Sequence, residues 1–132
     1  MGIWPSLKKE SKNKNIKNSE IEWPKNIVTL DDNNFEDFIN QYPITIVDFW
    51  AEWCAPCKTM APRLRRLFTI YRNRVAFGKI DIQKYQKISK KYNISSIPTL
   101  IFFKYGKVIQ SSFGVKSVGK IKTMIDDALE KL

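Results

Sequence analysis

The sequence contains no histidine and only two cysteines, Cys54 and Cys57, among its 132 residues. A structural zinc site needs about four cysteine, histidine or carboxylate ligands, and the chain offers no second cysteine pair to complete one. The lack of histidine also excludes Cys-His and Ser-His nucleophilic pairs. We therefore expect no metal, and any acid or base that assists the cysteines must be a carboxylate, a lysine or the other thiol.

Long apolar runs are missing as well. No stretch reaches the roughly 18 residues of a membrane span, and the short apolar stretch near the N-terminus precedes its lysines, the reverse of a secretory signal. We therefore expect a soluble, cytoplasmic protein. Residues 1–22 are rich in Lys, Asn, Ser and Glu and show no periodicity. This composition predicts a flexible basic extension over 1–22, followed by one domain over 23–132.

Gly2 lies in a short pattern, M-G-x-x-x-S, that matches N-myristoylation sites and is followed by lysines. Such a short pattern is often met by chance. Alternatively, the apolar residues Ile3, Trp4 and Leu7 dock on the domain or extend into solvent. Gly2 therefore remains a weak indication of membrane attachment, which we do not expect.

The formal net charge of +10 raises the question of nucleic-acid binding. The basic residues are scattered along the chain, acidic residues interrupt most of the runs, and no nucleic-acid motif is present. A solvated basic surface that favours acidic protein partners is the better interpretation. We expect a monomer without specific nucleic-acid binding.

Periodicity from Trp23 onward predicts alternating strands and helices. Short β-branched and apolar runs predict strands, whereas apolar residues at spacings of three and four predict helices. The predicted strands cover 26–30, 44–50, 75–82, 99–104 and 107–113, and the predicted helices about 35–42, 54–71, 84–92 and 121–132. Asp31, Asp32 or Asn33 is expected to cap the first helix. The order predicts an α/β domain with a mostly parallel sheet and an antiparallel edge hairpin.

The two cysteines lie where a strand ending near Trp50 is followed by a helix. A cysteine at a helix N-terminus meets unpaired N–H groups and the positive end of the dipole, which favour the thiolate. We therefore expect Cys54 to attack disulfides and Cys57, one turn further in and more buried, to resolve the mixed disulfide. Pro56 suits an early helical position. A purely structural bridge is disfavoured, because so short a loop restricts the unfolded chain little.

Asp48 is a carboxylate in the middle of the apolar strand 44–50. Alternation places it on the same face as Ile46 and Trp50, so we expect it to point inward. Burial raises the pKa of a carboxyl group, which would let Asp48 accept the proton of Cys57 near neutral pH. The alternative is a charged residue at a strand bulge or edge.

The run VDFWAEWCAPCK over 47–58, with Ile97-Pro98-Thr99 and Phe113-Gly114 further on, resembles the thioredoxin family over about residues 26–132. Thioredoxins are a known example of a C-x-x-C motif with a lowered cysteine pKa. The resemblance implies the thioredoxin fold, in which a central mixed sheet of about five strands is flanked by about four helices in three layers.

The resemblance also implies further site residues. A cis Ile97–Pro98 peptide would face the cysteines, and its backbone would pair with an extended substrate segment. Lys79 would stand beside Asp48 and offset part of its raised pKa, although a lysine that merely extends from a strand to solvent fits equally well. The implied substrate-binding residues are Trp53, Ala55, Pro56, Ile97, Pro98, Gly114 and Val115, with Trp53, Ile97, Gly114 and Val115 lining a shallow apolar groove.

The implied activity is reduction of disulfides in protein substrates, with electrons from a thioredoxin reductase and no bound cofactor. The alternatives are a more oxidising oxidase or isomerase, and a binding or scaffold module that uses the groove. Ala55 stands where the family usually has glycine, and Ser96 where many members do. Because the family varies the residues between the cysteines to tune reduction potential, Ala55 leaves the potential open.

Overall fold

The computed structural model describes residues 20–132. The Gly2 pattern and most of the predicted extension over 1–22 therefore lie outside the described residues. Where the description begins, Ile21 and Trp23 pack against the core. The Trp23 ring stacks on that of Tyr42 with 5.4 Å between the ring centroids.

Between residues 28 and 130 the chain forms five strands and four helices in the predicted order. In chain order they are β1 (Val28–Leu30), α2 (Phe35–Gln41), β2 (Ile44–Trp50), α3 (Ala55–Ile70), β3 (Ala76–Asp81), α4 (Gln86–Lys91), β4 (Thr99–Lys104), β5 (Lys107–Phe113) and α5 (Val118–Glu130). The bounds of β2 and of the hairpin strands β4 and β5 agree with the prediction, whereas β1, β3 and α4 are shorter than predicted.

The strands form one sheet in the order β1-β3-β2-β4-β5. The β1/β3 and β2/β3 pairs are parallel, and the β2/β4 and β4/β5 pairs are antiparallel. The sheet is thus mixed, as the resemblance implies. The prediction of a mostly parallel sheet with an antiparallel edge hairpin was wrong in part, because β4 also runs antiparallel to the central strand β2.

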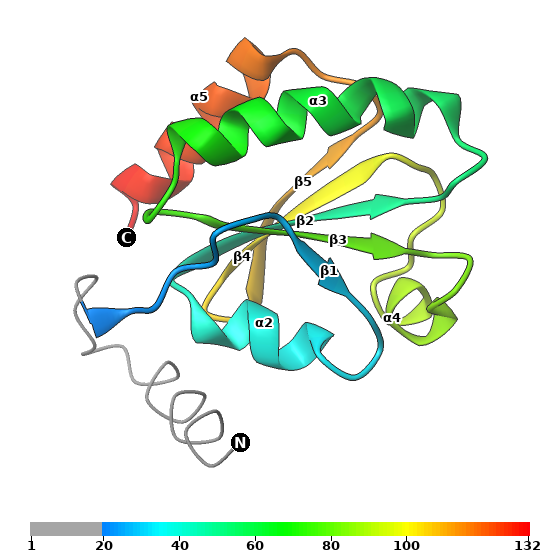
Figure 1. The fold of residues 1–132 in the computed structure, drawn as a ribbon, viewed down its shortest axis with the longest axis horizontal. Helices are drawn as coiled ribbons and strands as arrows, with labels where there is room; N and C mark the ends of the chain where they lie inside the picture. The colour runs from blue at the N-terminus through cyan, green and yellow to red at the C-terminus, as the bar shows by residue number, and fades with distance from the viewer. Residues whose placement is uncertain (1–19) are drawn as a thin grey trace.

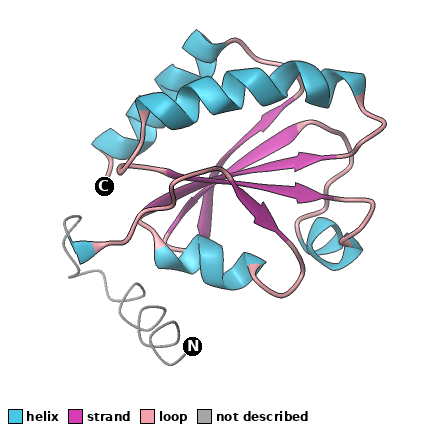
Figure 2. Ribbon diagram, viewed as in Figure 1, coloured by secondary structure: helices cyan, strands magenta, loops and turns pink. Residues whose placement is uncertain are grey.

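Helices cover both faces of this sheet. Figures 1 and 2 show α3 and α5 on one side and α2 and α4 on the other, which gives three layers. On β2, Ile44 and Ile46 belong to the core beneath α3 and α5, whereas Val47 and Phe49 belong to the core on the α2 and α4 side. Because both faces of β2 are buried, its sequence is a nearly continuous apolar run.

The acidic residues between β1 and α2 organise two helices. The Asp31 carboxylate accepts hydrogen bonds from the Asn33 and Asn34 N–H groups at 2.8 Å each. Asp31 thus stabilises the turn that leads into α2. The prediction that Asp31, Asp32 or Asn33 caps this helix was wrong, because the N-cap residue is Asn34, which makes no side-chain capping hydrogen bond. The Asp32 carboxylate instead accepts a hydrogen bond at 3.2 Å from the Ile88 N–H in α4. Asp32 therefore ties α4 to the start of α2, a contact that local patterns do not reveal.

The sheet topology brings three distant segments to one end of the molecule. Phe49, near the end of β2, pairs with Thr99 at the start of β4, and Thr99 pairs with Phe113 at the end of β5. The residues that continue these strands therefore lie near one another. They are the β2–α3 loop with the cysteines, the segment 96–98 and the Gly114 turn.

Candidate active site

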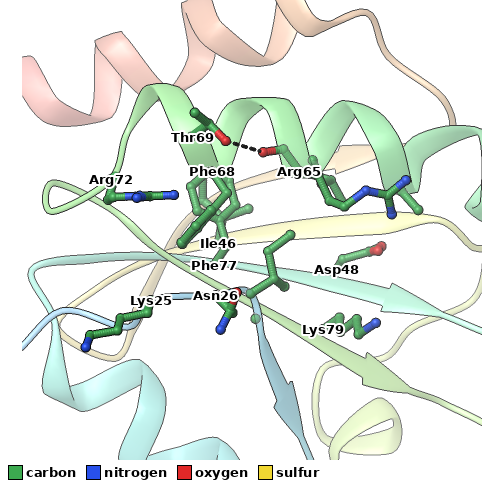
Figure 3. Close-up of a pocket in the computed structure, with 14 residues that line it drawn as sticks. Lys25, Asn26, Ile46, Asp48, Arg65, Phe68, Thr69, Arg72, Phe77 and Lys79 are labelled. Atoms are coloured by element: carbon green, nitrogen blue, oxygen red, sulfur yellow. Dashed lines mark hydrogen bonds between the residues drawn. The ribbon is translucent and has the colours of Figure 1, made fainter.

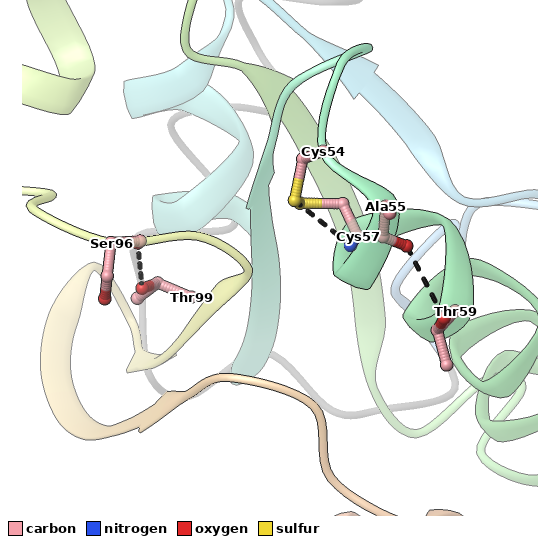
Figure 4. The surroundings of a disulfide bond; sticks show 6 residues. All are labelled: Cys54, Ala55, Cys57, Thr59, Ser96 and Thr99. Carbon is pink, nitrogen blue, oxygen red and sulfur yellow. Dashed lines mark hydrogen bonds between the residues drawn. A yellow bond between two sulfur atoms is a disulfide. The ribbon is translucent and has the colours of Figure 1, made fainter.

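Cys54 and Cys57 lie at the N-terminus of α3, where the sequence placed them. Cys54 is the N-cap residue, with extended backbone angles, and a proline occupies one of the first helical positions. The two cysteines form a disulfide with a Cα–Cα distance of 5.3 Å. Figure 4 shows the Cys57 N–H donating a hydrogen bond to the Cys54 Sγ, over 3.1 Å. A backbone donor is therefore aimed at the first sulfur.

The expectation that Cys57 is the more buried cysteine is wrong for this oxidised state. Each cysteine is only 3% exposed. The disulfide draws both sulfurs into one small apolar cluster, so neither is more accessible than the other. Exposed residues still flank Cys54 on both sides, since Trp53, Ala55 and Pro56 all face solvent. The cluster comprises Ala51, Cys54 and Cys57, with Trp50, Ile82 and Ile97 packed against it.

Asp48 is buried in the sheet, as alternation predicted, and is 6% exposed. Its Oδ1 has no hydrogen-bond partner among the described residues. Burial raises the pKa of Asp48 from its ordinary value of 3.8 to about 7, while the positive charge of Lys79 opposes the rise. A pKa in this range allows both protonation states near neutral pH. The regular pairing of Asp48 with both neighbouring strands excludes the bulge or edge alternative.

Lys79 is the register partner of Asp48 on the neighbouring strand β3. Its ammonium lies 5.6 Å from the centroid of the Trp50 ring. Lys79 thus acts on Asp48 through its charge, and the ion pairs found in the described part of the chain do not include these two residues. The Lys79 ammonium thus also has a cation–π contact with Trp50, which the sequence did not indicate.

The segment before β4 faces the disulfide through Ile97. The Ile97–Pro98 peptide is cis, as the resemblance implies. Pro98 itself is buried, and its carbonyl accepts a hydrogen bond of 2.8 Å from the Gly114 N–H. The Thr99 hydroxyl donates to the Ser96 carbonyl over 2.7 Å, as Figure 4 shows. The Pro98 ring is therefore buried and its carbonyl is hydrogen-bonded within the fold, and the expected contact of Pro98 with substrate stays a prediction.

Ile97 has two backbone groups that could pair with a neighbouring chain. Within residues 20–132, no hydrogen-bond partner is present for its N–H or its carbonyl. Its side chain is half-buried and packs against the cysteine cluster. A neighbouring extended chain could therefore pair with the Ile97 backbone directly beside the disulfide.

The segment after β5 is fixed beside α3 by two contacts. An Arg63 guanidinium nitrogen donates to the Lys116 carbonyl over 2.9 Å, and the Lys116 N–H donates to the Met60 sulfur over 3.4 Å. These contacts hold Val115, which is 39% exposed, at the helix that carries Cys57. Sequence reasoning missed the role of Arg63, because the sequence of a basic helix does not distinguish an arginine that bonds to another segment from one that only faces solvent.

Trp53 is 66% exposed on the other side of the cysteines. It lines an open hollow of about 510 Å³ whose other residues are all polar. The surroundings of Trp53 are therefore polar, and the apolar groove expected from Trp53, Ile97, Gly114 and Val115 stays a prediction. The other residues of the hollow are Glu52, Asp81, Gln83 and Lys84.

Comparison with known proteins identifies the family to which this site belongs. The family model for thioredoxin matches residues 26–127. The chain belongs to the thioredoxin family. The thioredoxin of Buchnera aphidicola (from Acyrthosiphon pisum) is 38% identical over 102 residues, which cover 76% of this chain and 94% of that protein. Thioredoxin C-2 of Corynebacterium nephridii is 40% identical over 101 residues, which cover 76% and 94%.

A solved structure agrees with this thioredoxin assignment. It comes from work on the thiol-resolving mechanism of a yeast mitochondrial 1-Cys peroxiredoxin through the glutathione and thioredoxin systems. The TM-score is 0.71 at 30% identity, and the match covers 76% of this chain and 94% of the other. The thioredoxin fold and the thiol-disulfide oxidoreductase function are therefore confirmed, and the protein is a thioredoxin-type protein-disulfide reductase. Among the described helices, none is long and apolar enough to cross a membrane.

Proposed function

We propose that Cys54 is the attacking sulfur of this reductase, Cys57 the resolving sulfur and Asp48 the proton acceptor. The Cys54 thiolate attacks one sulfur of a substrate disulfide, and the other substrate sulfur leaves as a thiolate. Cys57 then loses its proton and attacks Cys54 in the mixed disulfide. The second substrate thiolate is then released. The two electrons that reduce the substrate come from the cysteine pair, which ends as the Cys54–Cys57 disulfide.

The position of Cys54 at the start of α3 is the observation that carries this assignment. The Cys57 N–H points at the Cys54 Sγ, and the 16-residue helix adds the positive end of its dipole. Both stabilise a negative sulfur at position 54, and neither acts in the same way on Cys57. Cys54 is therefore the better nucleophile and the better leaving group of the pair.

Asp48 is the proposed proton acceptor for Cys57. It is a buried carboxyl group on the face of β2 that α3 covers, and its pKa of about 7 allows both protonation states near neutral pH. Because its Oδ1 has no partner in the described part of the chain, a water molecule is the proposed carrier between carboxylate and thiol. Lys79 is a positioning residue that limits how far the pKa of Asp48 rises.

The proposed substrate is an extended segment that carries a disulfide. It would pair with the free backbone groups of Ile97, while the apolar side chains of Ile97 and Val115 contact its side chains. Trp53, Ala55 and Pro56 would cover the other side of the reacting sulfurs, since all three are exposed. Pro98 and Gly114 contribute by holding Ile97 in place through their mutual hydrogen bond.

The proposed cycle needs no bound cofactor, because the cysteine pair itself carries the electrons. A separate thioredoxin reductase would return the disulfide to the dithiol. Such a cycle requires a reducing compartment, and we propose the cytoplasm.

Turnover of insulin disulfides with dithiothreitol tests this function. The wild-type protein should accelerate reduction strongly, whereas Cys54→Ser and Cys57→Ser should reduce insulin no faster than dithiothreitol alone. Equal rates for all three proteins would refute the assignment. A parallel measurement of the reduction potential against glutathione should give a reducing value, and a strongly oxidising one would favour the oxidase or isomerase alternative.

A further inference from the structure

A cavity of about 430 Å³ lies between α3, strands β2 and β3, and the segment 25–27. This volume is typical of sites for small organic ligands. The cavity is reached from the α3 side of the sheet, and of the proposed site residues only Asp48 and Lys79 line it. The proposed reductase cycle assigns no ligand to it.

The residues that line this cavity are strongly unbalanced in charge. Four of them are cations, namely Lys25, Arg65, Arg72 and Lys79, and Asp48 is the single acid. The ion pairs of the described residues involve none of these cations. Lys25, Arg65 and Arg72 are exposed, so they can meet a ligand that enters from solvent. The cavity is therefore electropositive over most of its wall.

The two ends of the cavity differ. Figure 3 shows Asp48, Arg65 and Lys79 toward one end and Lys25 and Arg72 toward the other, with apolar side chains between them. At the Asp48 end a carboxyl group accompanies the cations, whereas at the Lys25 and Arg72 end no acid lines the cavity. The Lys25 and Arg72 end is thus the place where an anionic group is most strongly favoured. The central apolar wall includes Ile46, Phe68 and Phe77.

Arg72 is held for such a role by its own contact. Its guanidinium carbon lies 5.4 Å from the centroid of the Phe68 ring, so the planar group packs on an aromatic wall of the cavity. Packing on a ring face leaves the N–H edge of a guanidinium free, and this edge matches the paired oxygens of a phosphate or carboxylate. A lysine beside it supplies a second, mobile donor.

We propose that this cavity binds a small amphiphilic anion, with a phosphate or carboxylate group between Lys25 and Arg72 and an apolar body along Ile46, Phe68 and Phe77. The unpartnered Oδ1 of Asp48 lies at the far end of the same cavity. An apolar body that reaches this end removes water from the carboxyl group, and binding therefore raises the pKa of Asp48 further. Ligand occupancy is thereby linked to the proposed proton acceptor of the reductase cycle.

The test is a binding titration of the oxidised full chain with 2-naphthyl phosphate, followed by amide chemical shifts in NMR. We expect saturable shifts at Ala61, Phe77 and Gly78, which line the cavity. Inorganic phosphate lacks the apolar body, and 2-naphthol lacks the anionic group. Each should bind at least about tenfold more weakly than 2-naphthyl phosphate, since the two parts contribute separately to affinity. A carboxylate analogue, 2-naphthoate, separates a site for phosphates from one for anions in general.

Variants locate the site. Arg72→Gln and Lys25→Gln should each weaken binding by about threefold to tenfold, as expected for loss of a charge-assisted hydrogen bond at an exposed site. Ala61→Leu should abolish binding by filling the cavity. Arg66→Gln is the matched control, because Arg66 is an exposed arginine of the same helix that does not line the cavity. Arg66→Gln should bind like the wild type.

Each result decides the proposal. It is supported if naphthyl phosphate binds with shifts at the cavity and only the cavity variants weaken it. It is overturned if the probe does not bind, if Arg66→Gln weakens binding as much as Arg72→Gln, or if the shifts cluster around Trp53 and Val115 instead. Insulin reduction by each variant is measured alongside, and binding is scored independently of that activity.

Discussion

Replacement of Asp48 by asparagine gives the sharpest test of how burial acts on this site. Asparagine has nearly the same shape as a protonated aspartic acid, but it cannot ionise. Asp48 is 6% exposed, and its Oδ1 has no partner among residues 20–132. Above neutral pH the wild-type protein therefore holds an ionised carboxylate in an unfavourable place, and the variant does not.

The size of the effect follows from linkage. The pKa of Asp48 is raised from 3.8 to about 7 in the folded protein. A tenfold change in proton affinity corresponds to about 1.4 kcal/mol, so the full effect is about 4 kcal/mol. The folded state holds the proton more tightly than the unfolded state. Ionisation therefore costs wild-type stability progressively as pH rises from about 4 to about 7, and the loss is complete above that range.

The assay is urea unfolding of the oxidised proteins at a series of pH values from 3 to 9. We expect the free energy of unfolding of Asp48→Asn, relative to wild type, to be constant below pH 4, to rise through neutrality and then to level off. The rise should be of the order of 4 kcal/mol, a large part of the stability of a typical domain. A difference that does not change with pH would refute the assignment of a raised pKa to Asp48.

Three further predictions follow from other contacts. Lys79→Gln removes the cation that favours ionised Asp48, so the loss of unfolding free energy with rising pH should occur at a higher pH than in the wild type. A loss at the wild-type pH would show that Lys79 does not act on Asp48. Phe49→Ala should lower the free energy of unfolding by about 3 to 5 kcal/mol, because Phe49 is fully buried; a loss below about 1 kcal/mol would contradict the core assignment. Ser117→Ala removes the cap that accepts the Lys120 N–H at 3.1 Å and should cost about 1 kcal/mol in the same assay, whereas Ser111→Ala on the exposed face of β5 should cost less.

Much of the fold could be predicted because its signals are local. The continuous apolar run over 44–50 predicted a strand buried on both faces, and β2 has these bounds. The hairpin turn was also predictable from Gly106, which adopts a positive φ of 85° that glycine tolerates well. The positive φ of Tyr105 was not predictable, because a tyrosine does not favour it. The direction of β4 relative to β2 was not predictable from the segment itself, because pairing between strands depends on the connection through α4.

The site was predictable to the extent that it lies on a single segment. Alternation along β2 placed Asp48 inward, and the strand-to-helix transition placed Cys54 at a helix terminus. Burial of the cysteines was not predictable from helix position, because it depends on Ile82 and Ile97, which come from other segments of the fold. The occupied carbonyl of Pro98 depends in the same way on Gly114, sixteen positions away in the chain.

Covalent trapping tests the central claim, that Cys54 attacks and Cys57 resolves, most directly. Reduced Cys57→Ser protein is mixed with native insulin, whose disulfides are intact. The products are separated without reductant and mapped by mass spectrometry. The proposed mechanism predicts a stable mixed disulfide through Cys54, which the wild-type protein does not accumulate because Cys57 resolves it. A mixed disulfide that accumulates instead in Cys54→Ser, through Cys57, would contradict the assigned roles.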